Sequence, residues 1–173
     1  MSERCDGILS DHYFRPTAGR KLFLLFAVIF CGLCFDPAQA AALDPKALKV
    51  VAKTFDFLVP KPPSQAKVVV VGSAVDLDAA RSSLANLSIA AGKSSDSAGA
   101  FAVFVSTPEE ALAARAANAH VLTIGGDVSC VTSGACLMAV ETQPKVTIYV
   151  SRAVAQASSI DFDPNFRMLI TEK

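Results

Sequence analysis

The sequence predicts an α/β domain: a three-layer sandwich with a mixed, mainly parallel sheet and an antiparallel edge hairpin. Three observations predict this class. Short apolar runs alternate with segments of helical periodicity, and strands joined by helices form parallel sheets through right-handed crossovers. The run 66–71 includes four consecutive valines and does not alternate, as in a strand buried on both faces. Two later apolar runs flank residues 142–144 and indicate a hairpin.

Residues 1–40 are predicted to be a leader that contains a secretory signal peptide. The apolar run 22–35 follows Arg20 and Lys21 and is too short to span a bilayer comfortably. The small residues Ala38 and Ala40 then suit a cleavage site. We therefore expect cleavage after Ala40 and a single exported domain over 41–173. An uncleaved membrane anchor is the alternative interpretation.

The composition supports one domain and excludes several partners. The chain has 173 residues, of which 52% are apolar, enough for a sizeable core. Removing the leader leaves twelve basic and twelve acidic residues, so the mature part is neutral. Without a basic patch, neither nucleic acid nor an anionic membrane surface gains electrostatic affinity for it.

The first predicted helix begins at Asp44-Pro45, which supplies an N-cap carboxylate and a proline for the first turn. Apolar residues at three- and four-residue spacing extend it to about Val59, where a proline-rich segment stops it. Strand 66–71 follows, bounded by Gly72.

The second helix is predicted to begin at the N-cap Asp76 and to carry an apolar stripe as far as Ala91, with Gly92 ending it. A polar, serine-rich connector over 93–99 leads to a strand over 100–105.

Residues 107–110, Thr-Pro-Glu-Glu, form a capping box with proline at the first helical position. The alanine-rich helix that it starts should reach about Asn118, and a strand follows over 121–124. After the hairpin of 137–140 with 146–150, Ser151 caps a helix to about Ala157, and Asp163-Pro164 starts a last turn.

Two cysteines, Cys130 and Cys136, bracket a polar loop over 127–136, whereas Cys5, Cys31 and Cys34 belong to the leader. In an oxidising compartment two cysteines in one loop favour a disulfide, worth about 2 kcal/mol in a loop this short. A zinc site would need further ligands, and a redox pair is more often Cys-x-x-Cys. Both remain alternatives.

Candidate catalytic groups have simpler explanations. A glycine pair and Asp127 after a strand are typical of a turn, and Gly72 lacks the glycine spacing of a dinucleotide site. His120 lies between a helix end and a strand start, and the carboxylate pairs lie at helix starts. We expect no enzyme activity, no metal and no cofactor.

The C-terminal part contains a cysteine loop with Gly134, a strand over 145–151, a helix over 152–157 and the segment Phe166-Arg-Met-Leu169. In this order, these features resemble the YfiR-like family of periplasmic proteins. The helix 50–60, with paired phenylalanines before proline, is similar to the family's opening helix. The cysteines of a second disulfide found in some members are missing.

This resemblance implies a small, often dimeric regulator that holds an inner-membrane diguanylate cyclase inactive through its periplasmic sensor region. In that picture the Cys130–Cys136 disulfide keeps the repressor folded. The leading hypothesis is therefore a non-catalytic, exported regulatory protein that binds and represses a membrane signalling partner, with a homodimer expected.

The alternative hypothesis is a periplasmic small-ligand-binding protein. Its site would be the crevice at the carboxyl ends of the strands, where α/β sheets bind ligands. The residues predicted to line it are Gly72, Ser73, Ser106 and Gly126.

Overall fold

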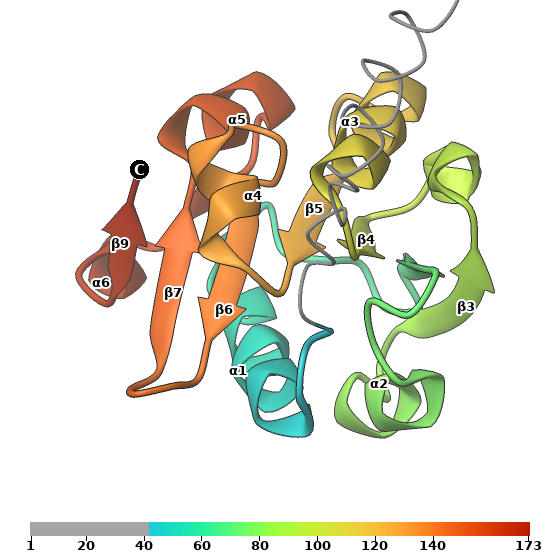
Figure 1. Ribbon diagram of the computed structural model, residues 1–173, viewed down its shortest axis with the longest axis horizontal. Helices are drawn as coiled ribbons and strands as arrows, with labels where there is room; N and C mark the ends of the chain where they lie inside the picture. The colour runs from blue at the N-terminus through green and yellow to red at the C-terminus, as the bar shows by residue number, and fades with distance from the viewer. Residues whose placement is uncertain (1–41) are drawn as a thin grey trace, which may run out of the picture. The chain divides into compact units, whose positions relative to one another are not determined.

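The computed structural model (Figure 1) describes residues 42–173, and the predicted leader and its cleavage site lie outside this range. The elements in chain order are α1 Pro45–Phe55, β1 Leu58–Val59, β2 Lys67–Val71, α2 Leu77–Ser83, β3 Ser88–Gly92, the 3-10 helix η1 Ser94–Ser97, β4 Ala102–Val105, α3 Pro108–Ala117, β5 Leu122–Gly125, α4 Val128–Thr132, β6 Met138–Glu141, β7 Thr147–Val150, α5 Arg152–Ser158, β8 Asp161–Phe162, α6 Pro164–Arg167 and β9 Ile170–Glu172.

A seven-stranded mixed sheet organises the domain, in the order β3-β2-β4-β5-β6-β7-β9. The strands from β3 to β6 are parallel, β6 and β7 form the antiparallel hairpin, and β9 pairs parallel with β7. A second, two-stranded antiparallel sheet joins β1 to β8. The predicted α/β class and the mixed, mainly parallel sheet are confirmed, and β9 adds one unpredicted strand beyond the hairpin.

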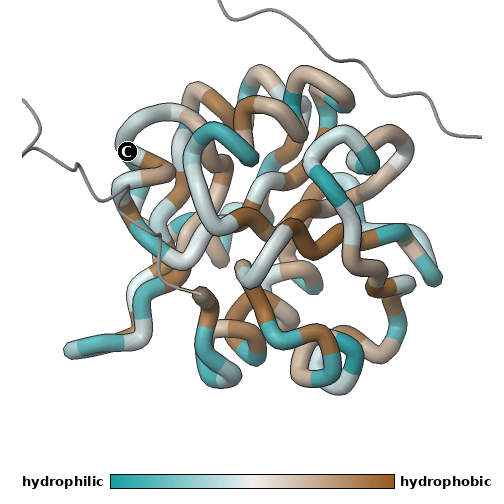
Figure 2. The backbone as a smooth tube through the Cα atoms, turned by 45° about the vertical axis from the view of Figure 1, so that its right-hand side comes forward, coloured by the Kyte–Doolittle hydropathy of each residue, from teal (hydrophilic) through white to brown (hydrophobic). Residues whose placement is uncertain are grey.

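Helices cover both faces of the sheet, which makes the three layers. Alternate strand residues face opposite sides: Val68 and Val70 pack with α1, whereas Val69 and Val71 pack with α3. The helices α1, α2 and α5 contribute to the first core, and α3 and α4 to the second. Figure 2 shows the most hydrophobic backbone running through the interior of the domain.

The start of α1 is as predicted, but its end is not. The Asp44 carboxylate accepts the Ala47 N–H at 2.6 Å and caps the helix. The helix ends at Phe55, and Leu58–Val59 form β1 instead of the predicted last turn. Leu58 and Val59 pair with β8, far along the chain, and the Pro60 that follows Val59 also disfavours helical geometry at that residue.

The second predicted helix is wrong in its second half. The helix α2 starts at the N-cap Asp76 but ends at Ser83, and Ser88–Gly92 form the edge strand β3. The small, half-exposed residues of this segment fit either a helix face or a sheet edge. Residues 88–92 pair with the whole of β2, which satisfies their backbone groups on one side. This pairing stabilises the strand over a helix.

Two segments that were predicted to be loops contain short helices. The polar connector 93–99 contains η1, and the predicted loop between the cysteines contains the short helix α4. The capping box of α3 and the Ser151 cap of α5 are confirmed. Within residues 42–173, none of the helices has the length and apolar character to cross a membrane.

Candidate functional site

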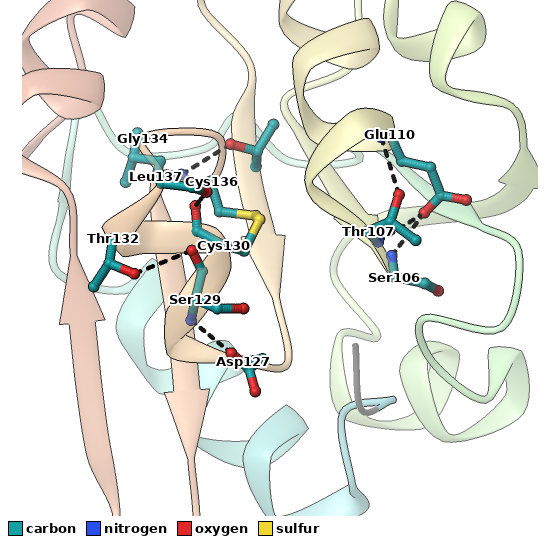
Figure 3. The surroundings of a disulfide bond; sticks show 12 residues. Ser106, Thr107, Glu110, Asp127, Ser129, Cys130, Thr132, Gly134, Cys136 and Leu137 are labelled. Carbon is teal, nitrogen blue, oxygen red and sulfur yellow. Dashed lines mark hydrogen bonds between the residues drawn. A yellow bond between two sulfur atoms is a disulfide. The ribbon is translucent and has the colours of Figure 1, made fainter. Parts of the chain in front are cut away.

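The segment 127–137 carries Cys130 and Cys136, and we call it the disulfide segment. It begins where β5 leaves the sheet (Figure 3). Asp127 caps α4 by accepting the Ser129 N–H on Oδ1 at 2.5 Å. After α4 the chain turns back at Gly134, whose φ of +72° is a left-handed conformation that glycine adopts without strain. The turn predicted around Asp127 is therefore a helix start.

The predicted disulfide is present, with the Cα atoms of Cys130 and Cys136 5.1 Å apart. Both cysteines are buried. The N–H groups of Ala135 and Cys136 donate to the Cys130 carbonyl oxygen at 3.1 and 2.8 Å. The covalent bond and these two hydrogen bonds together close a compact turn.

Gly125 allows the disulfide to rest directly on the sheet. A Cβ atom at this position would lie 3.1 Å from the Cys136 sulfur and 3.3 Å from the Cys130 Cβ. Both distances are shorter than ordinary van der Waals contact. The bridge therefore belongs to the core between the sheet and α4, where it is shielded from solvent.

Two hydrogen bonds connect the end of this segment to the rest of the domain. The Arg115 Nη1 group, from α3, donates to the Gly134 carbonyl oxygen at 3.0 Å. The buried Thr123 hydroxyl oxygen, from β5, accepts the Leu137 N–H at 2.9 Å. The disulfide segment is thus held by α3, by β5 and by its own bridge.

The carboxyl ends of β2 and β4 bring together two of the four predicted ligand residues. The left-handed Gly72, at φ +58°, is placed so that a Cβ atom would meet Ser106 Oγ at 3.9 Å and Glu110 Oε1 at 3.6 Å. The Ser106 Oγ atom is buried and has no hydrogen-bond partner among the described residues. Ser73 is exposed beside Gly72, and Gly126 follows β5, the next strand.

Glu110 is the residue at this edge that was not predicted as part of a site. Its Oε2 atom accepts the N–H groups of Ser106 and Thr107 at 2.8 and 3.2 Å (Figure 3). The capping box was visible in the sequence. The nearness of Glu110 to Gly72, however, depends on β2 and β4 being neighbours in the sheet. The local spacing of residues does not predict this pairing.

Two pockets lie away from these residues. The larger, of about 420 Å³, lies at the amino ends of β2 and β3 and is lined by Ala52, Phe55, Asp56, residues 61–65 and residues 83–87. The smaller, of about 360 Å³, is lined by residues of β7, α5, β8, α6 and β9. None of Gly72, Ser73, Ser106 and Gly126 lines either pocket.

Large apolar side chains are exposed around the small sheet. We call this surface, made by Phe57, Val59, Met168 and Leu169, the apolar corner. Met168 and Leu169 are 79% and 70% exposed. The ring of Phe57 stacks on Phe166 with centroids 4.8 Å apart, which joins the end of α1 to α6. Exposed apolar residues that cluster in this way are typical of binding surfaces.

The described residues contain two carboxylates whose pKa values are lowered by hydrogen bonds. No group of three metal-ligating side chains occurs there. The Thr142 hydroxyl, which donates to Asp44 at 2.7 Å, lowers the pKa of that carboxyl, and the Ala47 N–H adds to this effect. His120 is exposed, and its Nδ1 lies 3.1 Å from the Ser158 carbonyl oxygen.

Compared with known proteins, the sequence matches no protein-family model and no curated protein.

Proposed function

We propose that the protein is a non-catalytic periplasmic regulator that binds and represses an inner-membrane signalling partner, a diguanylate cyclase. The apolar corner is the observation that carries this proposal. Met168 and Leu169 belong to the segment on which the YfiR-like resemblance partly rests, and both are mostly exposed. Burying such side chains against a partner gains about 25 cal/mol per Å² of apolar area.

The disulfide supports the compartment part of the proposal. A buried Cys130–Cys136 bridge suits an exported protein, since cytosolic thiols are kept reduced. Its place in the core favours a structural role over a redox-sensing role, because a reductant reaches a buried bridge only when the segment opens.

The mechanism requires only binding that differs between two states of the partner. A cyclase whose sensor region exchanges between an active and an inactive state moves toward the inactive state if the regulator binds that state more tightly. The regulator needs no chemistry of its own for this. At the apolar corner Phe57 stacks on the buried Phe166, which gives the exposed Phe57 ring a defined position for such binding.

The test is complementation in cells that lack the gene, with intracellular cyclic di-GMP as the readout. The unmodified chain should lower cyclic di-GMP, and Met168→Glu with Leu169→Glu should abolish this effect while leaving the melting temperature unchanged. The matched control is Leu112→Glu, since Leu112 is an apolar residue of α3 that is 54% exposed. If the unmodified chain leaves cyclic di-GMP unchanged, the proposal is wrong.

A second candidate function is small-ligand binding at the carboxyl ends of β2 and β4. It is favoured by the buried Ser106 hydroxyl, which has no hydrogen-bond partner within residues 42–173 and lies beside the exposed Gly72. A ligand that binds the native state raises its melting temperature by mass action. A rise that is lost in Ser106→Ala would support this function, and equal rises in both proteins would contradict it.

A further inference from the structure

The larger of the two pockets is framed by backbone that is already hydrogen-bonded. It lies between the end of α1 and the loops 61–65 and 83–87, and we call it the α1–α2 pocket. The Gln65 N–H donates to the Asn86 carbonyl oxygen at 3.0 Å and so joins the two loops. The volume of about 420 Å³ lies within the range of about 300–1,000 Å³ that is typical of small-molecule sites. The pocket is therefore formed without a ligand and is large enough for one.

The polar side chains that line the α1–α2 pocket make no other polar contacts within residues 42–173. Four of them are neutral and carry an amide or a hydroxyl group, namely Ser64, Gln65, Ser83 and Asn86. None of these four side chains takes part in a hydrogen bond with another described residue. Asp56 and Lys61 also line the pocket, and neither forms an ion pair in the described part of the chain. All six side chains can therefore bond to a ligand without breaking a contact.

Gln65, in the wall of this pocket, has an unusual backbone conformation. Its φ of +62° is left-handed, a region that residues other than glycine, asparagine and aspartate seldom adopt. Such conformations persist where the surrounding structure fixes them, and they concentrate at ligand sites. Here the hydrogen bond from the Gln65 N–H to Asn86 fixes the conformation. The strained position of this amide residue is thus a second observation, independent of the volume, that indicates a binding role.

Apolar groups make up the rest of the lining. Phe55 and Leu84 are both 4% exposed, and Pro62 and Pro63 add rigid rings. An entirely apolar ligand would take water from the polar side chains without replacing their hydrogen bonds, which costs free energy. A ligand that fits this lining therefore carries polar groups around an apolar framework.

The charge of the lining narrows the class of ligand. The Asp56 carboxylate and the Lys61 ammonium balance each other, so neither an anion nor a cation gains a surplus of attraction. The amide and hydroxyl side chains both donate and accept hydrogen bonds, as the hydroxyl groups of a sugar do. We propose that the α1–α2 pocket binds a neutral saccharide, whose hydroxyl groups bond to these side chains and whose C–H groups pack on Phe55 and the prolines. No residue of the apolar corner lines this pocket, so saccharide binding and repression of a partner are separate activities.

The first test is a titration with glucose and with N-acetylglucosamine, followed by amide NMR on the protein purified from cells that express the full chain. The amide signals of the loops 61–65 and 83–87 should shift with a saturable dependence on at least one of the two sugars. Trimethylamine N-oxide at the same concentration controls for the general effect of an excluded solute. Glucuronate, which adds a carboxylate to the glucose ring, should bind no more tightly than glucose. The absence of a saturable shift with both sugars, or tighter binding of glucuronate, would overturn the proposal.

The second test locates the site with two variants that preserve the backbone. Gln65→Asn keeps the left-handed conformation, which asparagine adopts readily, but shortens the reach of the amide group. Asn86→Ala removes the other amide group. Each variant should raise the dissociation constant of the bound sugar at least ~5-fold, because each loses a hydrogen bond to it. The matched control is Asn165→Ala, at an exposed asparagine of α6 outside the pocket, which should leave the constant unchanged. The same dissociation constant in all three variants would contradict binding at this pocket.

Discussion

The two faces of the sheet have different cores. The face under α1 and α2 is filled by large side chains, among them Leu48, Phe104, Leu122, Ile124 and Met138, all fully buried. The face under α3 and α4 is filled mainly by valine and alanine, together with Cys130 and Cys136. The same strands supply both faces, so the difference lies in the side chains and in the helices that cover them.

This difference indicates two ways to hold a helix on a sheet. Large side chains remove more apolar area from water and stabilise in proportion to that area. Small side chains bury less apolar area, but they let the helix backbone approach the sheet closely, as the buried Ala111 and Ala114 of α3 do. On this second face the disulfide fixes a segment, α4, that is too short to be stable by itself.

We call the face under α1 and α2 the large-residue face and the face under α3 and α4 the small-residue face. The largest loss of unfolding free energy should come from Phe104→Ala on the large-residue face. Truncating a fully buried phenylalanine removes its transfer free energy and leaves a cavity, which together cost about 3–5 kcal/mol of unfolding free energy. The neighbouring Val103→Ala, on the small-residue face, should cost about 1–2.5 kcal/mol. Urea unfolding monitored by circular dichroism measures both. Equal costs would contradict the division into a large-residue and a small-residue core.

The next largest loss of unfolding free energy should come from removing the Cys130–Cys136 disulfide. Replacing both Cys130 and Cys136 with serine should cost about 2–3 kcal/mol, since the unfolded chain loses a covalent constraint and two hydroxyls enter a buried site. Urea unfolding compares this variant with the unmodified protein. Reduction by a thiol under native conditions should be slow, with a rate that follows the opening of α4. Rapid reduction of the folded protein would contradict a structural role.

A smaller effect is expected from Gly125→Ala, at about 1–2 kcal/mol, because the new Cβ would press on the bridge. This cost should fall when the bridge is absent, since separate serine side chains can move apart. A double-mutant cycle between Gly125→Ala and the serine pair measures this coupling. Additive costs would show that the glycine and the bridge are independent.

The features that depend on neighbouring residues could be predicted from the sequence alone. The caps at Asp44, Thr107 and Ser151 and the hairpin around residues 142–144 were predicted correctly, because these signals act within a few residues. The disulfide was predicted for the same reason, with its two cysteines six positions apart. Local chemistry was sufficient in each case.

The errors occurred where a distant strand decides the structure. Residues 88–92 have helical apolar spacing, yet pairing with β2 makes them a strand. Leu58–Val59 pair with β8, about a hundred residues later, and β9 pairs with β7 across α5 and α6. The same applies to the candidate site. Glu110 comes close to Gly72 only because β2 and β4 are neighbours.

The smallest predicted effect is a pH dependence that links the large-residue face to the hairpin. Asp44 caps α1 and accepts a hydrogen bond from Thr142 in the turn between β6 and β7. The Thr142 hydroxyl is the main cause that holds the pKa of this carboxyl below its ordinary value of 3.8. The N–H of Phe162, followed by Arg167, lowers the pKa of Asp161 in the same way.

A lowered folded-state pKa gives stability that is fully present above the unfolded pKa and is lost as pH falls through the folded pKa. The melting temperature should therefore fall as pH is lowered from about 5 toward 3. Asn also caps helices but does not titrate, so Asp44→Asn should flatten this fall. Thr142→Val, which removes the main cause of the shift, should flatten it partly. If all three proteins show the same pH profile, Asp44 does not supply this stability, and the contact between the helix cap and the hairpin is energetically neutral.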